Sequence, residues 1–165
     1  LTNPAGVKRQ VIGVFTADLC LPLAEVLKVL GTKHAMIVHS DDGLDEISIA
    51  AGTQVTELCD GNIESYHINP EDFSLQRQSL DGLSVNSVAD SADLIRRALA
   101  GADDEPAQKA AAMLALNAGA TIYVSGIAAT LADGVAMAED ALASGLAAEK
   151  LQHFIAFTQS MRGQG

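Results

Sequence analysis

Several residue types are scarce in this sequence. Tryptophan is absent, and aromatic residues make up only 4% of the 165 residues. Ten lysines and arginines stand against 21 aspartates and glutamates, so the formal net charge at pH 7 is −11. The basic residues are scattered, and an acidic surface without a basic cluster repels nucleic acid and anionic membranes. We therefore expect no nucleic-acid partner and no membrane partner.

Cysteines and long apolar runs are scarce as well. Cys20 and Cys59 are the two cysteines of the sequence and form no CxxC motif. Isolated thiols in apolar stretches are typical of small buried side chains in a reducing compartment. No apolar run approaches the ~18 residues of a membrane span, and the opening LTNPAGVKRQ lacks the pattern of a signal peptide. The sequence thus predicts a cytoplasmic protein.

Hydrophobic periodicity indicates a strand, a helix and a second strand in the first forty residues. Residues 9–15 and 34–40 are short apolar runs typical of buried strands. Between them, apolar residues recur at helical spacing up to Gly31, a plausible helix end. A strand–helix–strand unit of this length predicts two parallel strands joined by a right-handed crossover.

The rest of the chain predicts a hairpin followed by helices. Asp60-Gly61 between two alternating runs is a strong hairpin signal, so we expect strands near 53–59 and 62–68. A polar connection leads to three helical segments, at 87–101, at 105–126 and from 130 onward, the last broken near Ser144-Gly145. The whole is expected to be an α/β fold, with a mostly parallel sheet flanked by helices and one β-hairpin.

The segment HSDDGLDEIS, residues 39–48, brings four carboxylates into the loop that follows the second predicted strand. Ligands of open α/β sheets bind beyond the carboxyl ends of the strands. A calcium loop that starts at Asp41 is excluded, because the required glycine at position 6 and acid at position 12 are absent. Two interpretations stay open. One is a solvated acidic turn; the other is a magnesium site, in which Asp45 and Glu46 act together with substrate phosphates.

Several segments, in order along the chain, resemble the anthranilate phosphoribosyltransferase family of tryptophan biosynthesis. They are LTNPAGVKRQVIGVF, LAEVLKVLG, HAMIVHSDDGLDEIS, NPEDF, VNSVADSADLIRRAL and LNAGATIYVSGIA. The resemblance implies the catalytic-domain fold that this family shares with nucleoside phosphorylases. It implies transfer of the phosphoribosyl group of phosphoribosyl pyrophosphate to the amine of anthranilate, with release of pyrophosphate. It also implies that Asp45 and Glu46 of the GLDE stretch hold Mg²⁺.

The family's amino-terminal helical domain, with its glycine-rich phosphate loop and its anthranilate contacts, has no counterpart in these 165 residues. The resemblance therefore implies that residues 1–165 are the carboxy-terminal part of a glycosyltransferase family 3 type α/β catalytic domain. We expect this chain alone to be inactive, and we assign it no catalytic residue. We expect the full-length enzyme to be a homodimer, assembled mainly through the helical part.

Two other functions fit the same fold, and a few further residues carry expectations of their own. A pyrimidine nucleoside phosphorylase shares the fold, and a nucleic-acid-binding paralogue would share it too, although the net charge of −11 argues against the paralogue. Asn117 is expected to satisfy nearby backbone groups, and His39 to form a local hydrogen bond. His34, His67 and His153 show no metal-ligand spacing.

Overall fold

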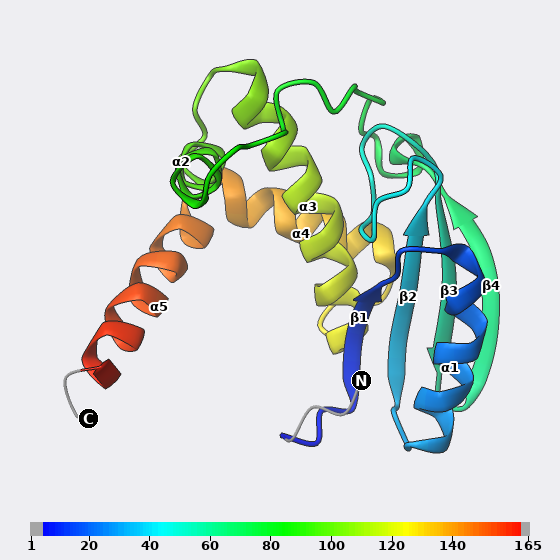
Figure 1. The fold of residues 1–165 in the computed structure, drawn as a ribbon. Coiled ribbons are helices and arrows are strands. Elements are labelled where there is room, and N and C mark those ends of the chain that lie inside the picture. Colours follow the sequence, from blue (N-terminus) through cyan, green and yellow to red (C-terminus); the bar gives the residue numbers. More distant parts are fainter. Residues whose placement is uncertain (1–4, 163–165) are drawn as a thin grey trace.

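The computed structural model describes residues 5–162 as an α/β fold (Figure 1). The four strands are β1 (Arg9–Gly13), β2 (His34–Ser40), β3 (Thr53–Cys59) and β4 (Asn62–Ile68). Two short 3₁₀ helices are η1 (Ala17–Leu19) and η2 (Pro70–Phe73). The α-helices are α1 (Cys20–Val29), α2 (Val88–Leu99), α3 (Glu105–Ser125), α4 (Leu131–Ala143) and α5 (Leu146–Arg162).

The four strands form one sheet in the order β1-β2-β3-β4. The α/β class, the flanking helices and the hairpin are confirmed. The expectation of a mostly parallel sheet is wrong for the described residues, because only β1 and β2 pair in parallel and the other two pairings are antiparallel. Residues 41–52 form a loop and not a crossover helix, so β3 returns antiparallel beside β2.

Local signals in the sequence set the helix boundaries. The N-caps of α2, α3 and α4 are Ser87, Asp104 and Thr130, and each side chain accepts a hydrogen bond from a backbone N–H of the first turn. Helix α3 ends at Ser125, and its C-cap Gly126 has a left-handed φ of 84°. The first strand ends at Gly13, two residues earlier than predicted, and Phe15 is 79% exposed.

The sheet is covered on both faces, and alternate residues of β2 serve the two layers. Ala35 and Ile37 pack in the same cluster as Leu27 of α1, whereas Met36 and Val38 pack in the cluster of Leu116, Ala120 and Val124 from α3. Successive strand residues point to opposite faces, so β2 is buried on both sides. Figure 1 shows α1 and α3 on either side of the sheet.

Helix α3 packs closely against α4. A Cβ on Gly119 would lie 2.6 Å from Cα of Val135, and one on Gly134 would overlap the carbonyl oxygen of Gly119. Only glycine permits this approach, so α3 and α4 form one closely packed pair. Helix α5 leads away from the sheet (Figure 1). Within residues 5–162, no helix has both the length and the apolar character needed to cross a membrane.

Candidate metal-binding site

The acidic loop joins β2 to β3 at the carboxyl end of β2. The N–H of Asp41 donates to the carbonyl of Gly52 across the base of the loop, at 2.9 Å. The N–H of Ser40 donates to the carbonyl of Leu44, also at 2.9 Å. Gly43 between them has a φ of 91°, a conformation that other residues rarely adopt. These contacts fold residues 40–44 into a tight turn and direct the chain that follows it.

The first two acids of the loop both have partners, one on β4 and the others within the loop. Asp42 accepts hydrogen bonds from the Ser48 hydroxyl at 2.6 Å and from the Leu44 N–H at 3.3 Å. Asp41 pairs with Nε2 of His67 on β4 at 3.0 Å. Both carboxylates are exposed, as a solvated turn would have them, but their partners tie the loop to itself and to the neighbouring strand.

The ionisation of Asp42 reflects these bonds. Burial acts to raise its pKa, and hydrogen bonds from Ser48, Ser40 and the Leu44 N–H outweigh that effect. The pKa of Asp42 therefore lies below its ordinary value. Asp42 stays ionised at neutral pH as a fixed acceptor of the loop.

Asp45 and Glu46 differ from the first two acids. Both are exposed, and their carboxylates have no hydrogen-bond or ion-pair partner among residues 5–162. Four carboxylates thus divide into two that build the loop and two that are free to bind a ligand. The free pair is the one that the resemblance assigns to Mg²⁺.

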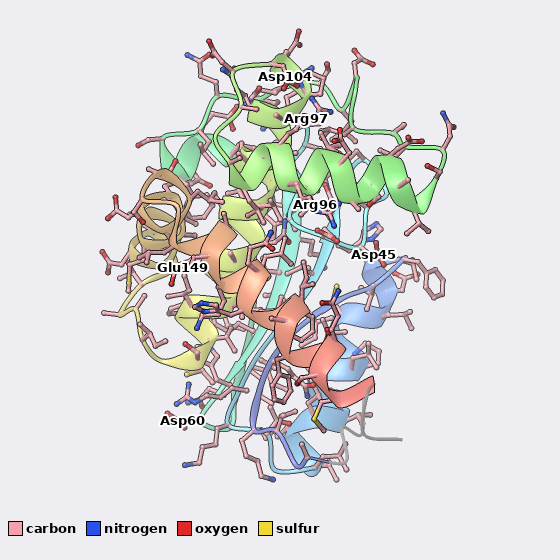
Figure 2. The ribbon with its side chains drawn as sticks, turned by 90° about the vertical axis from the view of Figure 1, so that its left-hand side faces the viewer. Asp45, Asp60, Arg96, Arg97, Asp104 and Glu149 are labelled. Atoms are coloured by element: carbon pink, nitrogen blue, oxygen red, sulfur yellow. The ribbon has the colours of Figure 1, made fainter. Side chains whose placement is uncertain are left out.

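The free pair borders a largely apolar pocket of about 420 Å³. Its walls come from the segment at 80–85, from α2 and from α3, with Leu83, Leu94 and Met113 among the apolar members. Figure 2 shows Asp45 just beneath α2. A cation bound by Asp45 and Glu46 would therefore lie next to an apolar surface.

The residues present fit a divalent cation in their chemistry and in the space around them. Carboxylate oxygens are the hard ligands that Mg²⁺ prefers, and one or two are usual when substrate phosphates complete the coordination. Gly13 at the end of β1 makes room for the loop, because a Cβ there would overlap the carbonyl oxygen of Asp45. The free pair is thus held directly above the end of β1.

His39 and Asn117 have structural roles. Nδ1 of His39 lies 2.8 Å from the carbonyl oxygen of Val14, the expected local hydrogen bond. Asn117 bonds to backbone groups, as expected. No pattern in the sequence predicts the contacts made by Gly13 and His67, because both depend on which strands are neighbours in the sheet. Cys20 is buried as predicted, but Cys59 is exposed because it ends β3.

A second group of possible metal ligands lies at the opposite end of the sheet. His34, Glu57 and Cys59 offer donor atoms within 4.8 Å of one another. The Glu57 carboxylate already binds His34 at 2.6 Å and accepts the hydroxyl protons of Tyr66 and Tyr123 at 2.7 and 2.9 Å. A carboxylate with three partners serves the fold, so we assign this group no cation.

Comparisons with known proteins agree with the fold. The model of a glycosyl transferase family, a/b domain, matches residues 1–148. Anthranilate phosphoribosyltransferase of Cellvibrio japonicus is 59% identical over 98% of this chain, and that of Teredinibacter turnerae is 60% identical over 96%. The matches cover 47% and 46% of those proteins, so the chain spans about half the length of the curated relatives it matches.

Solved structures give the same picture. Anthranilate phosphoribosyltransferase from Thermus thermophilus superposes with a TM-score of 0.84 at 36% identity, over 96% of this chain and 45% of that one. The Saccharomyces cerevisiae protein, solved in complex with PRPP and Mg, superposes with a TM-score of 0.77 at 22% identity, over 92% and 43% of the two chains. At that identity the yeast likeness supports the fold alone.

Proposed function

Because the chain belongs to the glycosyl transferase family whose a/b domain matches residues 1–148, we propose that it is the α/β part of an anthranilate phosphoribosyltransferase. The reaction transfers the phosphoribosyl group of phosphoribosyl pyrophosphate to the amine of anthranilate and releases pyrophosphate. The identity of 59–60% to two relatives with that name supports this assignment. The activity is proposed for a protein of the relatives' length, which is about twice the length of this chain.

We propose Mg²⁺ as the metal and Asp45 and Glu46 as its ligands. The observation that carries this is the division of the acidic loop, in which these two carboxylates alone lack partners in the described part of the chain. Bound there, magnesium would neutralise charge on the departing pyrophosphate. The two side chains hold negative charge at the end of β1 and β2, and the turn at Gly43 and the bonds of Asp42 keep them in place.

The net charge of −11 gives the metal a second role in this proposal. Carboxylates repel a polyphosphate, and in the pocket beside them no Lys or Arg lies among the lining residues of the described chain. In this proposal, a cation accompanies the anionic substrate when it approaches this surface. We further propose that the longer protein is a cytoplasmic homodimer, with small molecules as substrates and no nucleic-acid partner.

An anthranilate assay tests the function. The chain would be compared with a version extended upstream to the length of its relatives, each with anthranilate, phosphoribosyl pyrophosphate and Mg²⁺, and the loss of anthranilate fluorescence would be followed. We expect turnover by the extended version and none by the 165 residues alone. Turnover by the short chain would contradict the proposed need for the other half. No turnover by either, together with phosphorolysis of uridine, would favour the nucleoside phosphorylase instead.

A further inference from the structure

Asn117 on α3 grips the backbone directly after the free pair. Its Oδ1 accepts the N–H of Ile47 at 3.0 Å, and its Nδ2 donates to the carbonyl of Ile47 at 2.9 Å. Nδ2 also donates to the carbonyl of Met113, one turn back on α3, at 3.0 Å. A single side chain therefore satisfies both backbone groups of Ile47 and is itself held to its helix.

The grip is built on a rigid support. Two residues beyond Asn117, Gly119 lies against the backbone of α4, so α3 has little freedom to shift at this point. The side chain of Ile47 is 3% exposed and belongs to the cluster that α3 shares with the sheet. Ile47 is thus fixed both through its backbone and through its side chain.

The free pair is confined from the other side as well. Gly13 lies against the carbonyl of Asp45, where a Cβ would overlap it. Asp45 and Glu46 therefore stand between the end of β1 and the clamped Ile47, while neither carboxylate has a partner of its own among residues 5–162. The backbone of this segment is restrained at both ends, and the side chains are left available.

We propose that Asn117 is a positioning residue for the metal site. By holding Ile47, it fixes the direction in which Asp45 and Glu46 present their carboxylates to a divalent cation. This inference rests on the proposed metal role of the pair. Ligands held in one geometry bind a metal more tightly than ligands on a flexible loop, because less conformational entropy is lost on binding.

The test uses two readouts on the 165-residue chain. One is the exchange rate of the Ile47 amide without metal, and the other is the dissociation constant for Mn²⁺ alone, a cation with a similar preference for oxygen ligands. Asn117→Ala should speed Ile47 exchange about tenfold, because that amide loses its acceptor. It should also weaken Mn²⁺ binding about tenfold. This is the lower end of the loss in metal affinity that is usual when a residue supporting the ligands is removed.

Three further variants make the outcome decisive. Asn117→Ser keeps a hydroxyl that can bond to Met113 on its own helix but cannot span to Ile47, so it should repeat both changes even if the alanine variant folds poorly. Asn62→Ala, at an exposed position at the opposite end of the sheet, should change neither readout. Asp45→Asn combined with Glu46→Gln should abolish Mn²⁺ binding and leave Ile47 exchange slow.

The outcomes separate the inference from the proposal beneath it. Unchanged Ile47 exchange in the Asn117 variants would show that the clamp does not hold the loop. Fast exchange with unchanged Mn²⁺ affinity would show that the clamp is merely structural, and either result overturns the inference alone. Mn²⁺ binding that survives loss of Asp45 and Glu46, or no Mn²⁺ binding by the unaltered chain, would overturn the proposed metal site, and the inference with it.

Discussion

At the residue scale, the acidic loop shows that acidic residues in one short segment can have different roles. Asp41 and Asp42 have partners that pull the loop together, and Asp45 and Glu46 have none among the described residues. This division could not be predicted from the residues alone, because the segment at 39–48 is compatible with both a solvated turn and a metal site. The resemblance selected the pair, and the partners Ser48 and His67 are visible only once the strands are assembled.

This division predicts different effects for two substitutions in the loop, one on stability and the other on metal binding. Asp42→Ala should lower the free energy of unfolding by about 1 kcal/mol, because the Ser48 hydroxyl and the Leu44 N–H lose their acceptor. Asp45→Asn should leave that free energy nearly unchanged, because its carboxylate has no partner among residues 5–162, but it should weaken Mn²⁺ binding. Urea unfolding and metal titration of both variants check this. Equal losses of stability would contradict the division.

At the element scale, local signals in the sequence were sufficient where the structure is local. The ranges predicted for β2, β3 and β4 agree with the structure, because alternation and the Asp60-Gly61 turn belong to neighbouring residues. Both turn residues have a positive φ, as a tight hairpin of this kind requires. The direction of β3 beside β2 was missed because it depends on how residues 41–52 fold, and that loop is closed by contacts that no periodicity reveals.

Glu57 on β3 contacts residues of three other elements. We therefore expect its removal to lower the free energy of unfolding by a large amount. Its carboxylate binds His34 of β2, Tyr66 of β4 and Tyr123 of α3. Glu57→Ala would leave three donors without an acceptor in a largely buried place, so we expect a loss of about 3 kcal/mol.

The matched control for Glu57 lies across the hairpin. Glu64→Ala removes the directly opposite residue, which is exposed and has no partner among residues 5–162, and should cost less than about 0.5 kcal/mol. Thermal or urea unfolding of both variants measures the difference. If the two losses were similar, Glu57 would not join the sheet to α3 as the contacts indicate.

At the scale of the whole molecule, the same Glu57 group predicts how stability responds to alkali. Burial raises the pKa of Tyr66 well above its ordinary value, and the hydrogen bond to Glu57 adds to the rise. Burial and the bond to Glu57 also raise the pKa of Tyr123, to about 12. Neutral hydroxyls are needed to donate to a carboxylate, so the folded protein holds these protons more tightly than the unfolded chain does.

The sign of the effect follows from that difference. Below about pH 10 both tyrosines are neutral in the folded and the unfolded chain, so their contribution to stability is fully present. Above about pH 10 the unfolded chain releases protons that the folded chain keeps, and the contribution is lost as pH rises toward the folded pKa. We expect the melting temperature to fall as the pH rises from about 10 to about 11.5. The Tyr66→Phe, Tyr123→Phe double variant should start lower and fall less steeply. Parallel curves for the two proteins would mean that other groups cause the alkaline loss, and that these tyrosines do not couple the fold to pH.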